Sequence, residues 1–180
     1  MAVVLRAINM KTQYDTISLV DDYADAVYKF CRSLTYTKED ADDLFQETFL
    51  KAFEQLHKIN ASDNPQSFLF FIALYLWKSW KRRYARRNRI APTEPLDEMI
   101  ISDIGIEDSI IAQEDIRVVR NLIAALPEKL RIPTILFYSM EMSVADIAAT
   151  LRRPVGTVKS RLHKARKILE KGLMGIGYGQ

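Results

Sequence analysis

Six cations repeat at helical spacing near the carboxyl end of the chain, with a single acid, Glu170, among them. A run of cations on one helix neutralises phosphates and releases their counterions, so the pattern indicates nucleic acid as a ligand. A solvated basic face on a small helical core is the alternative that this segment alone leaves open. The cations are Lys159, Arg161, Lys164, Arg166, Lys167 and Lys171.

Two short helices and a turn are expected to position these cations. The first helix has an apolar stripe at helical spacing: Val144, Ile147, Ala148 and Leu151. A break follows at residues 152–154, because Pro154 has no backbone N–H to donate within a helix. The periodicity then resumes: Val155, Val158, Leu162, Ala165 and Leu169. The sequence predicts a helix-turn-helix, whose second helix suits insertion into the major groove.

A second group of cations lies between Lys78 and Arg89, which hold seven basic residues and no acid. Four aromatic residues are interleaved with this group: Tyr75, Trp77, Trp80 and Tyr84. Basic side chains follow a phosphate backbone and aromatic faces receive unstacked bases, so the combination favours melted single strands. Each aromatic residue taken alone is more often part of a core. Trp80 and Tyr84 share one helical face and could pack against the first helix of the chain.

Between these clusters and the amino end lies an acidic helix. Thr37 is a suitable N-cap, and the acids that follow it match the positive end of the helix dipole. Asp43, Gln46 and Glu47 are neighbours on the side opposite the apolar stripe. This side is either a plain solvated face or a surface that docks on a basic protein, where complementary charge sets orientation.

Composition limits the other possibilities. The chain has 180 residues, a net charge of +3 and one cysteine, so it holds no internal disulfide and no cysteine-based metal site. We expect Cys31 to be a buried small hydrophobe, and His57 and His163 to be structural or surface residues. We expect no catalytic residue, metal or cofactor, because phosphate loops, paired histidines and catalytic triads are missing. No apolar run reaches the ~20 residues that span a bilayer, so we expect a cytoplasmic protein with no direct membrane insertion.

The periodic segments are all helical, so the expected fold class is all-α with two small helical domains. The expected domains are residues 1–90 and 111–180, joined by a flexible acidic linker at residues 91–110. The glycine-rich tail at 172–180 is expected to fray. A proline at position 133 should kink or restart its helix. The expected helices before the helix-turn-helix are Thr16–Leu34, a second one ending near Leu56, Pro65–Arg87, Ile106–Leu126 and Glu128–Met140.

Three motifs resemble a known family. Residues 39–56 (EDADDLFQETFLKAFEQL) are similar to the polymerase-binding helix of region 2 in sigma factors, and residues 65–83 (PQSFLFFIALYLWKSWKRR) resemble its −10 recognition segment. Residues 126–131 (LPEKLR) with 155–169 (VGTVKSRLHKARKIL) resemble region 4. From about Val20 to Leu169, the chain therefore resembles the group IV (extracytoplasmic function, ECF) sigma factors of the sigma-70 family.

This resemblance implies a promoter-specificity subunit of RNA polymerase, with three sets of binding residues. The residues implied to bind core polymerase are Asp43, Gln46, Glu47 and Lys51. Those implied to bind the −10 element are Asn64, Ser67, Phe68, Tyr75, Lys78, Ser79, Arg82, Arg83 and Arg86. Those implied to bind the −35 element are Arg153, Val155, Thr157, Lys159, Ser160, Arg161, His163, Lys164 and Arg166.

The implied partners are core RNA polymerase, promoter DNA that is duplex at −35 and melted at −10, and an anti-sigma factor, free or membrane-anchored. About twenty extended linker residues reach ~70 Å, comparable to two turns of duplex at ~34–36 Å each. Three rivals remain: a stand-alone helix-turn-helix regulator, an adaptor that binds no DNA, and an enzyme.

Four residues depart from the family pattern. Asn and Asp are usual where this chain has Tyr75 and Ser79, so no −10 sequence preference is carried over. A helix former is common at Pro133. Glycine is frequent where Arg152 stands, so either Arg152 takes a left-handed conformation at some cost or the turn differs.

Overall fold

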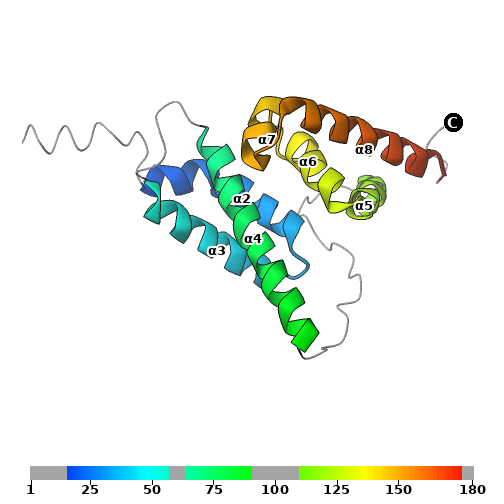
Figure 1. Ribbon diagram of the computed structural model, residues 1–180. Helices are drawn as coiled ribbons and strands as arrows, with labels where there is room; N and C mark the ends of the chain where they lie inside the picture. Colours follow the sequence, from blue (N-terminus) through cyan, green and yellow to red (C-terminus); the bar gives the residue numbers. More distant parts are fainter. Residues whose placement is uncertain (1–15, 57–63, 91–109, 176–180) are drawn as a thin grey trace, which may run out of the picture. The chain divides into compact units, whose positions relative to one another are not determined.

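The computed structural model describes residues 16–56, 64–90 and 110–175, and this part of the chain is built from helices without a strand (Figure 1). The fold is therefore all-α, as predicted. The chain divides into two compact units, residues 1–97 and 98–180. The finer division into 1–90, 91–110 and 111–180 stays a prediction, because nearly all of the expected linker lies outside the described residues. The helices are α2 (Thr16–Leu34), α3 (Lys38–Glu54), α4 (Pro65–Ile90), α5 (Ile110–Ala124), α6 (Glu128–Tyr138), α7 (Val144–Leu151) and α8 (Val155–Gly175).

In the first unit, α2, α3 and α4 pack against one another. The turn between α2 and α3 is closed by Thr37, whose hydroxyl oxygen accepts a hydrogen bond from the backbone N–H of Asp40 at 3.0 Å. This confirms the predicted N-cap. Tyr28 of α2 and Asp42 of α3 form a second contact between these two helices. The Tyr28 hydroxyl donates a hydrogen bond to an Asp42 carboxylate oxygen at 2.8 Å. That bond raises the pKa of Tyr28.

The core of the first unit is made where the apolar stripes of its three helices meet. The rings of Phe30 on α2 and Phe70 on α4 lie 4.5 Å apart between centroids, and both are fully buried. Leu19, Leu44 and Leu69 are fully buried with them. Thr48 is the one polar side chain at this depth on α3, and its hydroxyl donates to the Leu44 carbonyl at 2.6 Å. Leu19, Val27 and Phe30 of α2 and Leu44, Phe49 and Ala52 of α3 are buried, so one apolar side of each helix contributes to this core.

In the second unit, α6 and α7 both pack against α8, and α5 packs against α6 and α8. Leu136, Ile147 and Val158, one from each of α6, α7 and α8, are fully buried. Ser143 caps α7 by accepting a hydrogen bond from the Asp146 N–H at 3.1 Å. No helix in the described ranges has the length and apolar character needed to cross a membrane.

Several predicted helix ends were wrong. The second helix stops at Glu54 rather than Leu56, the third extends to Ile90, and α6 ends at Tyr138 rather than Met140. Of the two alternatives at Pro133, the restart is wrong and the kink stays a prediction: α6 is continuous, and Pro133 lies inside it as a fully buried residue. The ring fills core space, which offsets the hydrogen bond lost at that position.

The carboxyl end of α8 also differs from the prediction, because the helix continues through Gly172 to Gly175 instead of fraying from Gly172. Packing explains the difference. A Cβ atom at Gly172 would lie 2.6 Å from the Leu122 Cδ2 atom of α5, so glycine lets that leucine lie directly on the α8 backbone. The contact holds this last part of the helix against α5.

Cys31 is fully buried in the first unit, as predicted, and this burial raises the pKa of its thiol to about 12. We predict that Cys31 of the folded chain resists a thiolate-specific reagent such as dithionitrobenzoate at pH 8 and reacts fully in denaturant. The contribution of Cys31 to stability should be constant below pH 9 and fall between pH 9 and 12, because only the unfolded thiol ionises there. Rapid labelling of the native chain would contradict this burial.

Candidate nucleic-acid interface

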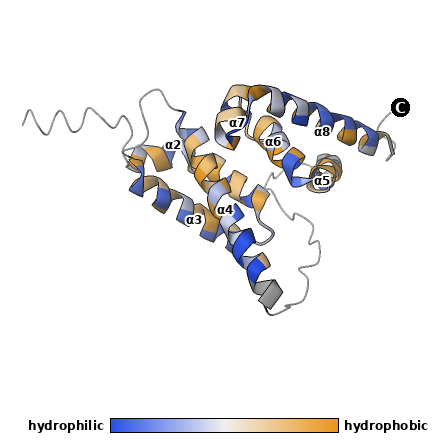
Figure 2. Ribbon diagram, in the orientation of Figure 1, coloured by the Kyte–Doolittle hydropathy of each residue, from blue (hydrophilic) through white to orange (hydrophobic). Residues whose placement is uncertain are grey.

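The outer face of α4 carries most of the side chains predicted to bind the −10 element. Tyr75, Lys78 and Ser79 recur at intervals of three or four residues, and the same spacing continues to Arg82 and Arg86. Tyr75 is 56 % exposed, and the three basic residues of this series are exposed. Arg83 is exposed beside them. Figure 2 shows the change along α4 from an apolar first half to a hydrophilic second half.

The first turn of α4 holds the other three residues of the predicted −10 set. Asn64 is exposed and caps the helix, since its side-chain oxygen accepts the Ser67 N–H at 3.3 Å. Ser67 is buried, so its role here is in the helix start rather than on the surface. Phe68 is half-buried on the same face as Tyr75.

The aromatic residues of α4 divide between core and surface. Trp77 is buried, as predicted for each aromatic residue alone, and the Lys81 ammonium lies 4.7 Å from its ring centroid. That prediction was wrong for Tyr75 and Tyr84, both of which are exposed. At 100° per residue these two tyrosines point to opposite sides of the helix, so only Tyr75 shares the −10 face.

Trp80 connects this helix to the acidic helix. Its indole N–H donates to a Glu47 carboxylate oxygen at 3.0 Å, and both side chains are half-buried. Trp80 is therefore bonded to α3, and its packing against the first helix stays a prediction. A charged acceptor makes this a strong bond, and it fixes the cationic half of α4 relative to α3.

The outer face of α3 presents the residues predicted to bind polymerase. Asp43 and Gln46 are exposed, while Glu47 is partly withdrawn by its bond to Trp80. Lys51 forms an ion pair with Glu54 at 2.7 Å, which raises the pKa of the lysine. The outer face of α3 thus combines the exposed polar groups of Asp43 and Gln46 with Lys51, whose charge is paired with Glu54 on the same helix.

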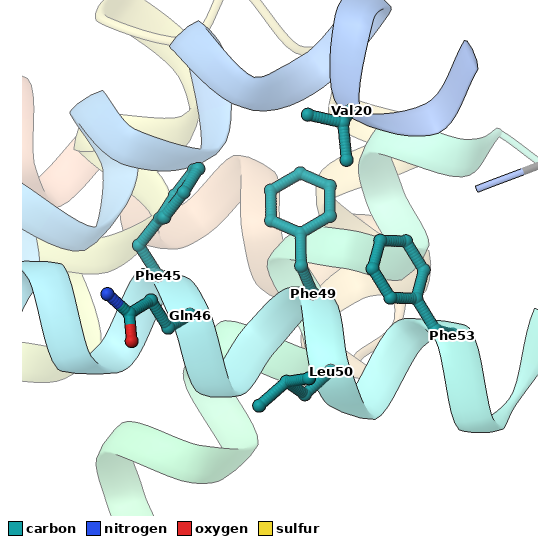
Figure 3. A pocket seen from close by; sticks show the side chains of 6 residues that line it. All are labelled: Val20, Phe45, Gln46, Phe49, Leu50 and Phe53. Atoms are coloured by element: carbon teal, nitrogen blue, oxygen red, sulfur yellow. The ribbon is translucent and has the colours of Figure 1, made fainter. Parts of the chain in front are cut away.

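An apolar groove runs beside this face, between α3 and the start of α2 (Figure 3). Three phenylalanines of α3 point toward Val20 of α2, and Leu50 and Gln46 lie along the other edge. The groove has a volume of about 270 Å³, and Leu50 is 64 % exposed. Its remaining lining residues are Phe45, Phe49 and Phe53.

Leu50 was missed at the sequence level. Its signal was available, because an apolar residue stands among Gln46, Glu47 and Glu54 on the polar side of α3. Leu50 and the adjoining groove together form an exposed apolar patch with a polar rim, which is typical of a protein-binding surface.

The turn between α7 and α8 is held by its backbone. Arg152 is left-handed, with φ 49° and ψ 53°, which confirms the first of the two alternatives for this residue. Its N–H bonds the Ala149 carbonyl at 3.1 Å, and the Arg153 N–H bonds the Ala148 carbonyl at 2.9 Å. This is the Schellman arrangement, which closes a helix with a left-handed residue.

The residues predicted to bind −35 DNA lie on or just before α8 and are mostly exposed. Arg153, Lys159 and Ser160 are exposed, as are His163 and Lys164. Thr157 and Arg161 are half-buried, nearer to the packed side of the helix. Val155 is 43 % exposed, so its assignment to the buried stripe was wrong, whereas Val158 and Ala165 are buried as predicted.

Arg166 has a partner within the unit. Its guanidinium donates to the hydroxyl of Tyr138 at the end of α6, at 3.1 Å. The bond directs Arg166 toward α6, at the edge of the exposed face of α8. Tyr138 was not among the predicted residues. Among the described residues, no cluster of three or more His, Cys, Asp or Glu side chains could hold a metal ion.

Comparison with known families matches both units. Residues 19–87 match the model of sigma-70 region 2, and residues 116–169 match that of sigma-70 region 4. The chain is 30 % identical to the ECF RNA polymerase sigma factor SigW of Bacillus subtilis over 88 % of each chain. It is 32 % identical to the ECF RNA polymerase sigma factor SigE of Mycolicibacterium smegmatis, over 84 % of this chain and 58 % of that one.

A solved structure is similar over most of its length. It is the sigma factor RpoE in complex with the anti-sigma factor NepR from Bartonella quintana. The TM-score is 0.71 at 25 % identity, covering 86 % of this chain and 94 % of that one.

The bond between Trp80 and Glu47 yields a prediction about stability. In a double-mutant cycle, Trp80→Phe and Glu47→Ala should show a coupling free energy of about 1 kcal/mol, because each change removes the same charged hydrogen bond. Urea unfolding of the full chain measures it. As a control, Lys51→Ala and Glu54→Ala should show no measurable coupling, since solvent screens that exposed pair. Strict additivity at Trp80 and Glu47 would contradict the prediction.

Proposed function

Because this chain belongs to the ECF sigma factors of the sigma-70 family, we propose that it binds core RNA polymerase and directs the enzyme to promoters through two DNA contacts. The first unit recognises the melted −10 element with the outer face of α4. The second unit recognises the −35 element with α8. The observation that carries this division is the series of exposed basic side chains that share one face of α4 with the exposed ring of Tyr75, separate from the cationic face of α8.

The docking surface for polymerase is α3. Asp43 and Gln46 supply exposed polar contacts, and the groove beside Leu50 accepts an apolar side chain of the enzyme. An apolar centre with a polar rim is the usual composition of a specific protein interface. Because Glu47 is bonded to Trp80, the same helix that docks on polymerase also positions the DNA-binding half of α4.

The α4 surface suits a single strand better than a duplex. Tyr75 offers an exposed ring for stacking a base, while Lys78, Arg82 and Arg86 follow the phosphates on the same face. The α8 surface suits a duplex, because a helix with several exposed cations and few acids fits the major groove. Ser160 and His163 lie among these cations and supply polar groups that can reach base edges.

The protein performs no covalent chemistry in this proposal, and polymerase supplies the catalytic site. It acts in the cytoplasm, where the enzyme and DNA are. An anti-sigma factor holds it inactive, a role supported by the similar Bartonella quintana sigma factor, which was solved with such a partner.

The proposal is tested by transcription in vitro. Core RNA polymerase is incubated with a genomic DNA library, with and without the full chain, and transcript start sites are mapped. The chain should create new start sites that share paired −35 and −10 elements. If it instead binds promoter duplex equally well without polymerase, it is a stand-alone regulator. If core enzyme gains no new start sites, the proposal fails.

The docking groove gives a first prediction about binding. Leu50→Ala should weaken binding of the chain to core polymerase about tenfold, because most of one leucine side chain is no longer buried at the interface. The thermal stability of the free chain should change little, since Leu50 is mainly exposed. Fluorescence anisotropy of the labelled chain measures the Kd. Val119→Ala, a change at an exposed apolar residue of α5, should leave it unaltered. An unchanged Kd for Leu50→Ala would remove the groove from the interface.

The α8 surface gives a second prediction about binding. In the complex with core polymerase, Lys164→Ala should weaken promoter binding and lower the slope of log K against log salt by about one, as expected for a lost phosphate contact. The matched control is Lys29→Ala, which removes an exposed cation from α2. Equal salt slopes for Lys164→Ala and the unaltered chain would exclude Lys164 from the DNA interface.

A further inference from the structure

The apolar groove between α2 and α3 continues to the amino end of α2. Ile17 lies one helical turn before Val20 on the same side of α2, and its side chain is 70 % exposed. Val20 lines the groove and faces the phenylalanine rings of α3 (Figure 3). Exposed apolar side chains beside an apolar groove form a patch that a partner commonly covers. This patch extends to the second residue of α2, directly after residues 1–15.

The sequence of residues 1–15 matches this patch in polarity. These residues lie outside the described part of the chain. An apolar run occupies positions 2–5: Ala2, Val3, Val4 and Leu5. Arg6 and Lys11 follow the run, and no acid occurs before Asp15. The segment therefore combines an apolar run with a positively charged flank, and this combination complements an apolar groove with an acidic rim.

The two helices supply that acidic rim. Asp21 and Asp22 follow Val20 on α2, and both are exposed. Asp43 of α3 is exposed one helical turn before Gln46, which lines the opposite edge of the groove. Complementary charge orients two surfaces and speeds their encounter. The cations that follow the apolar run are therefore attracted to this rim when the run lies in the groove.

Residues 6–15 are long enough to bring the apolar run to the groove. Ten extended residues span at most ~33–36 Å. The α3 side of the groove runs from Phe45 to Phe53, a rise of only ~12 Å along the helix. A short tether keeps the local concentration of the run near the millimolar range, so even a weak contact is populated. Because the segment joins α2, it reaches the Val20 side first, and Leu50 lies at the opposite edge (Figure 3).

We propose that residues 2–5 occupy the Val20 side of this groove in the free chain, with Arg6 at the acidic rim, and that core polymerase must displace them. The inference rests on the proposed function, in which polymerase uses the same groove, and adds a competitor within the chain. A groove that is open in only a fraction of the molecules lowers the apparent affinity for polymerase by that fraction. The chain therefore binds polymerase more weakly than its docking surface alone permits.

The test uses the full chain and two variants of it. Leu5→Asp places a charge within the apolar run. Asn9→Asp, the matched control, changes the charge of the same segment equally at a polar position. Methyl NMR spectra of the free chain report on the groove through Ile17 and Val20, and on the fold through the fully buried Leu69. Fluorescence anisotropy of the labelled chain measures the Kd for core polymerase.

We expect Leu5→Asp to shift the methyl signals of Ile17 and Val20, because a carboxylate does not enter an apolar groove, and to leave those of Leu69 in place. Its Kd for polymerase should fall about threefold, the value for a groove filled in about two of every three chains. Asn9→Asp should match the unaltered chain in both measurements, since a screened surface charge contributes little. The signals should not depend on chain concentration, because the contact is intramolecular.

The spectra and the Kd separate failure of this inference from failure of the proposed function. If Leu5→Asp leaves the Ile17 and Val20 signals unchanged, residues 2–5 do not fill the groove, and the proposed function stands when polymerase binds the unaltered chain. If the signals change with chain concentration, a second copy fills the groove and the inference is wrong. Shifted signals with an unchanged Kd exclude competition. If polymerase does not bind the unaltered chain, the proposed function fails and the competition fails with it.

Discussion

The burial of one apolar stripe on each cationic helix is the constraint from which both proposed DNA-binding surfaces follow. In α4, Leu69, Phe70 and Ala73 are fully buried against the other helices of the first unit. Burying one large apolar side chain contributes about 1.5–3 kcal/mol. A rotation of α4 by one residue, or 100°, would expose this stripe and turn basic residues toward the core. The packing therefore fixes which side of the helix carries Tyr75, Lys78 and Arg82, and the same reasoning applies to Val158 and Ala165 in α8.

The polar contacts refine this arrangement. Packing alone leaves the position of the long cationic half of α4 weakly determined, because the exposed residues after Trp80 offer little apolar surface. The bond from Trp80 to Glu47 supplies a directional contact at the point where the apolar stripe ends. Glu47 therefore contributes to two proposed surfaces at once: it lies on the face of α3 proposed to dock on polymerase, and it holds the start of the half of α4 proposed to bind DNA.

Periodicity and residue type were sufficient to predict the helices and the N-cap at Thr37, because each depends on residues within one segment. It failed where the outcome depends on contacts between segments. The indole N–H of Trp80 is bonded to Glu47 of another helix, and α8 continues past Gly172, where Leu122 of α5 packs against it. Pro133 stays inside a helix because its ring is fully buried. The groove beside Leu50 needs two helices, so no pattern within α3 defines it. The bond of Arg166 to Tyr138 likewise joins residues far apart in sequence.

The separation of two modest binding surfaces on one chain has a consequence for specificity. Each surface presents only a few exposed cations, so either alone gives a salt-sensitive contact of limited strength. When both are held on one partner, the second contact forms at the high effective concentration set by the tether, and the affinities combine without any new interaction. That gain is lost when the geometry prevents simultaneous contact.

A duplex with both elements at the required spacing is therefore favoured over one that contains either element alone. In the proposed function, polymerase sharpens this selection, because docking through α3 would fix the first unit on the enzyme. This explains why a chain with only +3 net charge can concentrate its cations on two helices and still discriminate among promoters.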